Sequence, residues 1–232
     1  MLYYYFSIVW YNDFMFDLSS PTTFIPVIFL TLVAIFVSIL YKDAKKNIKE
    51  NNKDLPYYLE TAVSMNYIKR NILDNGRFKY RNHINSEVTY ENKTYNALRH
   101  AGVLYSMYLY ETLGLETEHK ELRIKSSKYF VDRYVKKFGK NKYIVISRPE
   151  EEQINIPVAK TGAVGIALCA LSNLYKENEI ELEILQGLGE FLISMQNKDG
   201  NIYAYYDLST KTVNKEATAV YYPAEAAFGL IN

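Results

Sequence analysis

The sequence offers little that could hold a disulfide or a metal ion. Its 232 residues include one cysteine, Cys169, so no disulfide can form within the chain. Cys169 lies in the apolar run 165–171, a setting typical of a buried free cysteine, whereas a catalytic thiol needs polar surroundings and a histidine partner. The histidines lack the spacing of metal ligands: His83, His100 and His119. We therefore expect no bound metal and no cofactor.

Glycine and proline are sparse, and neither sign of charge is in excess. The chain has 10 glycines and 6 prolines, and 27 basic residues balance 26 acidic ones to a net charge of +1. This composition is typical of a helical globular protein and not of a disordered one. The sequence also has no glycine-rich phosphate loop and no basic stripe. We expect no nucleic acid among its partners.

One long stretch near the start of the chain carries no charge. No charged residue occurs between Asp17 and Lys42, and the most apolar part runs for 18 residues from Phe24 to Tyr41. As a helix it would be about 27 Å long, close to the thickness of the hydrocarbon core of a bilayer. The stretch therefore predicts a single transmembrane helix at 22–41.

The segments around this span suggest how the chain is divided. Residues 1–21 are expected to form an apolar interfacial segment, 42–55 a charged linker, and 56–232 the folded domain. Lysines gather on one side of the span: Lys42, Lys45, Lys46 and Lys49. By the positive-inside rule the domain would face the cytoplasm, and the opposite orientation stays open.

The predicted domain contains an internal repeat. Asn75-Gly76 and Asp199-Gly200 each follow a helical pattern and are 124 residues apart, twice 62, with the extended segment Lys142–Ile146 between them. Each unit has an amphipathic helix, a turn and a helix rich in small residues. The amphipathic helices are expected at 57–73, 120–137 and 181–196, and the small-residue helices at 95–113, 160–176 and 217–231.

Small side chains distinguish the second helix of each unit. They include Ala101, Gly102, Gly165, Ala226 and Gly229, which allow helices to approach closely. These helices are expected to form an inner ring, with the charged amphipathic helices outside.

Three segments resemble one known group of folds. GEFLISMQNKDGNIY (189–203) resembles the outer helix and turn of α/α toroids, which include six-hairpin glycosidases and the terpenoid cyclase and prenyltransferase toroids. YNALRHAGVLYSMYLY (95–110) and YYPAEAAFGLI (221–231) are similar to their inner helices. The resemblance implies an all-α fold, a partial α/α toroid of about three helical hairpins with short β-turn strands. Six hairpins are usual, so we expect a truncated product, or a half that closes by dimerising.

In such a toroid the site lies where the inner helices begin. The expected substrate-binding residues are Arg99, Tyr95, Asn96, Lys160, Tyr205, Tyr221 and Tyr222, and the expected catalytic residues are Glu225, His100 and Asp207. Arg99 would bind substrate while His100 transfers a proton. Glu225 is either a general acid/base or the partner of a buried cation. Asp207 and Glu225 form the one carboxylate pair suited to glycoside hydrolysis, although Asp207 also fits a turn cap.

These features favour one function over two others. The leading hypothesis is a membrane-anchored protein that binds or processes a carbohydrate or surface polymer, resembling a glycoside hydrolase if it is an enzyme. The rival is a non-catalytic module that self-associates through exposed apolar flanks. A lipid- or isoprenoid-handling protein is less favoured because the chain lacks an Asp-rich prenyl-diphosphate motif and an Asp-x-Asp-Asp acid.

Overall fold

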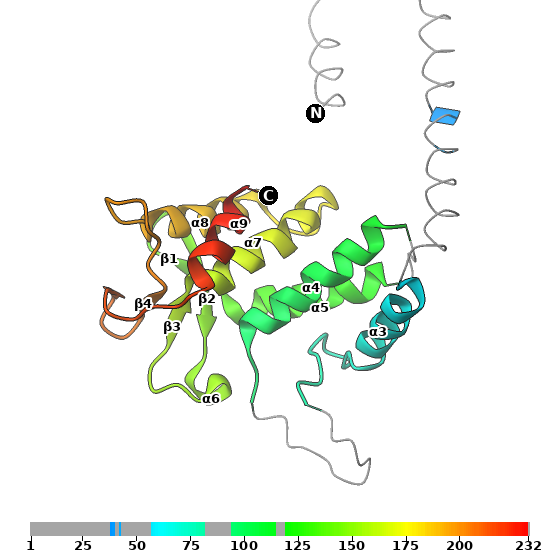
Figure 1. Ribbon diagram of the computed structural model, residues 1–232, viewed down its shortest axis with the longest axis horizontal. Coiled ribbons are helices and arrows are strands. Elements are labelled where there is room, and N and C mark those ends of the chain that lie inside the picture. The colour runs from blue at the N-terminus through cyan, green and yellow to red at the C-terminus, as the bar shows by residue number, and fades with distance from the viewer. Residues whose placement is uncertain (1–37, 40–41, 43–56, 82–93, 115–118, 232) are drawn as a thin grey trace, which may run out of the picture. The chain divides into compact units, whose positions relative to one another are not determined.

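The computed structural model describes residues 38–39, 42, 57–81, 94–114 and 119–231 (Figure 1). The chain divides into two compact units, 1–51 and 52–232. No helix in these described ranges is long and apolar enough to cross a membrane. The prediction of a transmembrane helix is corrected accordingly. The expected span at 22–41 and the segments at 1–21 and 42–55 lie outside the described residues, except at 38–39 and 42.

Helices make up much of the described part of the second unit, and most lie where the sequence predicts them. They are α3 (Tyr58–Arg70), α4 (Ala97–Thr112), α5 (Lys120–Tyr134), the short α6 (Pro149–Glu152), α7 (Thr161–Lys176), α8 (Leu182–Ser194) and α9 (Tyr222–Ile231). Apart from α6, each lies within or close to a range expected from apolar periodicity. The predicted order of helices along the chain is thus confirmed.

An antiparallel sheet accompanies the helices, so the prediction of an all-α toroid is wrong. Its strands pair in chain order: β1 (Val135–Phe138), β2 (Lys142–Ser147), β3 (Val158–Lys160), β4 (Tyr205–Asp207) and β5 (Thr212–Asn214). The helix expected to reach residue 137 ends at Tyr134, because Val135 is already extended at φ −84° and ψ 124°. Residues 135–147 are rich in β-branched and aromatic side chains, which favour a hairpin over a longer helix.

The first two strands of the sheet belong to the middle unit of the internal repeat. In the first and third units the turn is closed by one isolated bridge, Ile72 to Phe78 and Gln196 to Ile202, and these bridges are again 124 residues apart. In the middle unit the same position carries the full β1–β2 hairpin, with Val135 opposite Val145. The repeat is therefore confirmed, and its middle copy supplies the first two strands of the sheet.

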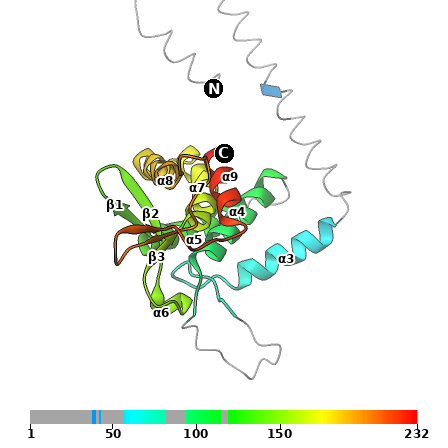
Figure 2. The same ribbon diagram turned by 60° about the vertical axis from the view of Figure 1, so that its left-hand side comes forward.

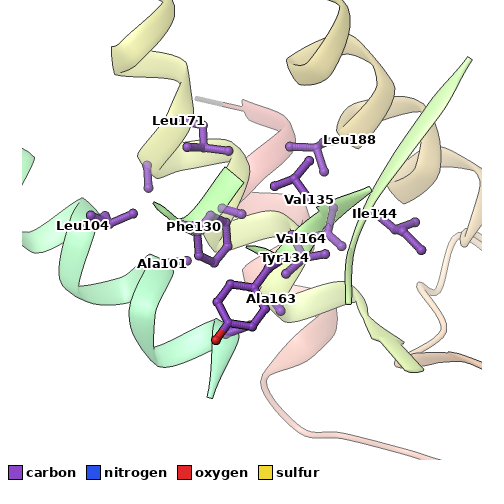
Figure 3. Packing of buried hydrophobic residues seen from close by; sticks show 14 of the residues in the cluster. Ala101, Leu104, Phe130, Tyr134, Val135, Ile144, Ala163, Val164, Leu171 and Leu188 are labelled. Carbon is purple, nitrogen blue, oxygen red and sulfur yellow. The ribbon is translucent and has the colours of Figure 1, made fainter. Parts of the chain in front are cut away.

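The core lies where the helices pack against the sheet. Figures 1 and 2 show α4, α5 and α7 next to one another, with α8 packed against β2. Side chains from these elements meet in one buried cluster, shown in Figure 3: Ala101, Leu104, Phe130, Tyr134, Ile144, Val164, Leu171 and Leu188. Cys169 is buried too, as predicted, and burial raises the pKa of its thiol to about 11.

Helices α7 and α9 approach each other through glycine. A Cβ atom on Gly165 would lie 2.2 Å from the backbone oxygen of Glu225, and one on Gly229 would lie 2.4 Å from the backbone oxygen of Gly165. Both distances are too short for any side chain, so the expectation of close approach is confirmed for this pair of helices. Gly102 differs, since a Cβ there would meet nothing within 4 Å. The contact fixes the backbone of Glu225 against α7.

Candidate functional site

A buried ion pair lies where α4 and α7 begin. Glu152, at the end of α6, accepts hydrogen bonds from the Asn96 side chain (3.2 Å), from the backbone N–H of Ala97 (3.3 Å) and from the Lys160 ammonium group. The side chains of Glu152 and Lys160 are only 4% and 11% exposed. Asn96 is the N-cap of α4, and Lys160 directly precedes the first turn of α7. The pair thus joins three elements at one point.

Glu225 lies against the first turn of α7. A Cβ on Gly162 would be 2.1 Å from Oε2 of Glu225 and 2.7 Å from Cδ1 of Tyr222, so only glycine leaves room for both side chains. Oε2 of Glu225 is buried and has no hydrogen-bond partner among the described residues. Burial raises the pKa of this carboxyl group. Burial therefore favours the neutral form of this carboxyl group more than water does.

Two tyrosines connect the ion pair with Glu225. The rings of Tyr205 and Tyr222 meet edge to face with centroids 5.4 Å apart. Tyr205 lies opposite Lys160 in the β3–β4 ladder. Burial raises the pKa of Tyr222, and the neighbouring Tyr205, Glu152 and Glu225 raise it further. We call the set the helix-start cluster: Asn96, Glu152, Lys160, Tyr205, Tyr222 and Glu225.

His100 and Tyr95 lie in the core and not in this cluster. The backbone N–H of Phe78 donates to the Tyr95 hydroxyl (3.1 Å), and that hydroxyl lies 2.7 Å from Nδ1 of His100. Nε2 of His100 lies 3.1 Å from the backbone oxygen of Ser126, which can only accept. His100 therefore carries its proton on Nε2 and accepts at Nδ1. Burial lowers its pKa to about 3, so the ring stays neutral.

The remaining predicted residues lie at the surface or in turns. The Asp207 carboxylate accepts from the backbone N–H groups of Ser209 (2.7 Å) and Thr210 (3.1 Å), which is the turn-capping alternative. These N–H groups lower the pKa of Asp207, that of Thr210 most. Arg99 is exposed and forms no part of the helix-start cluster, and Tyr221 is 73% exposed.

Glu152 was absent from the sequence prediction. The available signal was the acidic run at 150–152 after Pro149, since proline in a first turn followed by carboxylates is typical of a helix start. That signal does not say which glutamate turns inward. In the structure Glu151 pairs with Arg133 and accepts from the Tyr134 hydroxyl, while Glu152 reaches Asn96.

Two hollows open on the described surface. One of about 280 Å³ adjoins the helix-start cluster through Tyr205 and is lined by Ile156, Val158, Tyr205, Asp207, Asn214, Ala217 and Thr218. Its volume is at the lower end for ligand sites, about 300 Å³. The other, of about 680 Å³, lies over α5 and contains no predicted site residue. Its charged groups include Lys128 and Arg133, which pair with Glu179 and Glu151. The smaller hollow is the better candidate because it touches the cluster.

Comparison of the chain with protein-family models, with curated proteins and with solved structures finds no match in any of the three. Function is therefore argued from the helix-start cluster and its surroundings.

Proposed function

We propose that the helix-start cluster binds a carbohydrate. The observation that carries the proposal is the Glu225 carboxyl group, whose buried Oε2 has no hydrogen-bond partner among the described residues. A buried polar atom without a partner costs about 1–3 kcal/mol, so a ligand hydroxyl that completes its hydrogen bonding gains that amount back. Sugars supply hydroxyl groups that both donate and accept.

The neighbours of Glu225 suit the same class of ligand. Tyr205 and Tyr222 combine an apolar ring with a polar hydroxyl, a combination that can stack on a sugar ring and bind its hydroxyls. Tyr205 also lines the 280 Å³ hollow, which would hold the part of the ligand beyond Glu225. The ion pair of Glu152 with Lys160 holds the starts of α4 and α7 in place behind the two rings.

The arrangement favours binding over hydrolysis. Glycoside hydrolysis normally needs two carboxyl groups that both face the scissile bond. Glu152 already accepts from three donors, and the Asp207 carboxylate is occupied by the N–H groups of its own turn. Of these three carboxyl groups, Glu225 is then the one with an oxygen that forms no hydrogen bond among the described residues and could bind a ligand.

The proposal is tested with the full chain and a panel of neutral oligosaccharides, using saturation-transfer NMR and calorimetry. We expect Glu225→Ala to weaken binding about tenfold, since a hydrogen bond to a buried acid contributes about 1.4 kcal/mol or more. Glu190→Ala, which removes an exposed glutamate from α8, is the matched control and should change nothing. Equal binding by Glu225→Ala and the wild type would refute the proposal, as would a panel with no binder.

The pH dependence supplies a second measurement. Because the neutral carboxyl group is the hydrogen-bond donor, wild-type affinity should fall as the pH rises through the raised pKa of Glu225. Glu225→Gln keeps a neutral donor at every pH, so its affinity should stay constant over the same range. A wild-type affinity that does not change with pH would contradict the donor role.

A second candidate function is self-association through the region of α9. Its exposed apolar residues include Val220 (86% exposed), Tyr221 (73%) and Ile231 (81%). A contiguous apolar surface formed by such residues would be typical of a protein interface. Sedimentation equilibrium tests the idea. Val220→Lys with Ile231→Lys should lower the association state, whereas a wild-type chain that stays monomeric at high concentration would exclude it.

A further inference from the structure

Two arginines contact the ring of one tyrosine, Tyr80, and one of them, Arg99, lies in the first turn of α4. Nη1 of Arg99 donates to the Tyr80 hydroxyl at 2.7 Å, and its Cζ lies 5.5 Å from the centre of the Tyr80 ring. The Cζ of Arg81 lies 5.8 Å from the same ring centre. Lys79, directly before Tyr80 in the chain, is exposed, as are Arg81 and Arg99. We call these four residues the Tyr80 patch.

The positive charge of the Tyr80 patch is not balanced within the described structure. Among the described residues, no carboxylate forms an ion pair with Lys79, Arg81 or Arg99. Three buried or half-buried arginines elsewhere have carboxylate partners: Arg123 pairs with Glu111 and Glu177, Arg133 with Glu151, and Arg148 with Glu150. A tyrosine face attracts cations but cannot neutralise them. Two guanidinium groups held at one ring therefore favour an anion between them.

The patch and the helix-start cluster share the first turn of α4. The backbone N–H of Arg99 donates to Oδ1 of Asn96 at 3.0 Å, and the Asn96 side chain donates in turn to Glu152. Asn96 caps α4 through this contact, which holds the backbone of Arg99 in place. A ligand bound at the cluster that extends along the start of α4 would reach the patch.

We propose that the Tyr80 patch binds the carboxylate groups of an acidic polysaccharide whose neighbouring sugars occupy the helix-start cluster. The proposal rests on the proposed function and narrows its ligand to a uronic-acid polymer. Guanidinium groups match a carboxylate with two parallel hydrogen bonds, which a lysine cannot provide. A polymer with one carboxylate on each sugar can place an acid at the patch while its hydroxyls meet Glu225.

The test compares two ligands of equal length, an oligogalacturonate and its methyl-esterified neutral form, titrated into the full chain by calorimetry. We expect the acidic form to bind more tightly, and to weaken as salt rises. Arg99→Gln should weaken the acidic ligand about tenfold, as for loss of a charge-assisted hydrogen bond, and leave the neutral ligand unchanged. Arg99→Lys keeps the positive charge but cannot form the two parallel hydrogen bonds. Its affinity for the acidic ligand should lie between that of the wild type and that of Arg99→Gln.

Arg70→Gln is the matched control, because Arg70 is an exposed arginine at the end of α3. It should leave both affinities within about twofold of the wild type. Equal affinity for the acidic and neutral forms would overturn the proposal, and so would equal effects of Arg99→Gln and Arg70→Gln. Single-stranded DNA of matched charge is a third ligand, and tighter binding of DNA than of the oligogalacturonate would also overturn it.

The outcomes separate this proposal from the one on which it rests. If the neutral oligosaccharide binds and depends on Glu225 while Arg99→Gln has no effect, carbohydrate binding stands and the acidic class is wrong. If neither form responds to Glu225→Ala, carbohydrate binding at the cluster has failed, whatever the arginine variants do. Thermal unfolding of each variant confirms that the fold is retained, which is expected because Arg99 and Arg70 are both exposed.

Discussion

Replacing Gly165 with alanine should separate α9 from α7. The added Cβ would lie 2.2 Å from the backbone oxygen and 2.6 Å from the backbone carbon of Glu225. Ordinary contacts begin at about 3.4 Å, so one helix must move by roughly 1 Å. Because the obstacle is backbone and not the end of a flexible side chain, the strain should be near the upper end of overpacking, about 3 kcal/mol.

Part of this loss is offset by helix propensity. Alanine is favoured over glycine in a helix interior by about 1 kcal/mol. The net loss for Gly165→Ala is then about 2 kcal/mol, or roughly 4–8 °C in melting temperature for a domain of this size. Gly102→Ala is the matched control on α4. Its Cβ would meet nothing within 4 Å, so it should gain up to about 1 kcal/mol from propensity alone.

Urea unfolding and thermal scans of the two variants measure the difference, which should be about 3 kcal/mol. Hydrogen exchange shows where the loss falls, and the amides of α9 should exchange faster in Gly165→Ala. Because the contact is with the backbone of Glu225, carbohydrate binding should weaken as well. A Gly165→Ala variant as stable as Gly102→Ala would refute the close approach of α7 and α9.

Three further substitutions or conditions test other parts of the structure. Arg123→Met removes a partner of two partly buried glutamates and should cost about 3 kcal/mol in urea unfolding. Lys137→Met, which breaks an exposed pair, should leave the urea midpoint unchanged, and equal effects of the two substitutions would contradict the buried network. Tyr95→Phe leaves Nδ1 of His100 without its donor and should cost about 1–3 kcal/mol; no loss would contradict the chain of hydrogen bonds. Acidification should lower the free energy of unfolding because His100 is buried in its neutral form. Its folded pKa is depressed to about 3, so the stability it contributes is present above pH 6.5 and is lost as pH falls through 6.5, by about 1.4 kcal/mol per unit. NMR of the imidazole nitrogens checks this, and protonation of His100 with a midpoint above pH 5.5 would contradict it.

The helices could be predicted because their signals are local. Apolar residues at three- and four-residue steps mark α8, and Asn-Gly or Asp-Gly turns mark the ends of α3 and α8. The spacing of 124 residues between these turns predicts the repeat from the sequence alone.

The sheet could not be predicted from the same signals. β3, β4 and β5 have three residues each, too few to show the alternation of a half-buried strand. Their pairing is also distant in sequence, since Val158 lies opposite Asp207. The toroid resemblance implied an all-α fold with short β-turn strands, and it gave no reason to join distant segments into one sheet.

The candidate site was predictable where it depends on helix starts and unpredictable where it depends on burial. Asn96, Lys160 and Glu225 begin helices, and the structure brings Asn96 and Lys160 to one glutamate. His100 also begins a helix, beside a small-residue stretch that resembles a cavity wall. Its burial is caused by contacts from elsewhere in the chain, including the Phe78 ring at 4.7 Å. Nothing within residues 95–110 reveals those contacts.

Glu225 links the stability of the fold to the proposed activity. Gly162 and Gly165 bring its side chain and backbone against α7, and this places Oε2 where no described residue can donate to it or accept from it. A polar atom buried without a partner lowers stability by about 1 kcal/mol here, at the lower end of the usual range because the residue is only half-buried. Glu225→Met fills nearly the same space without that polar atom. We expect it to raise the free energy of unfolding by about 1 kcal/mol at neutral pH while carbohydrate binding weakens about tenfold, and Glu190→Met to change neither. A less stable Glu225→Met would show that the carboxyl group has a partner in the folded chain, and the main reason to place a ligand at this position would be gone.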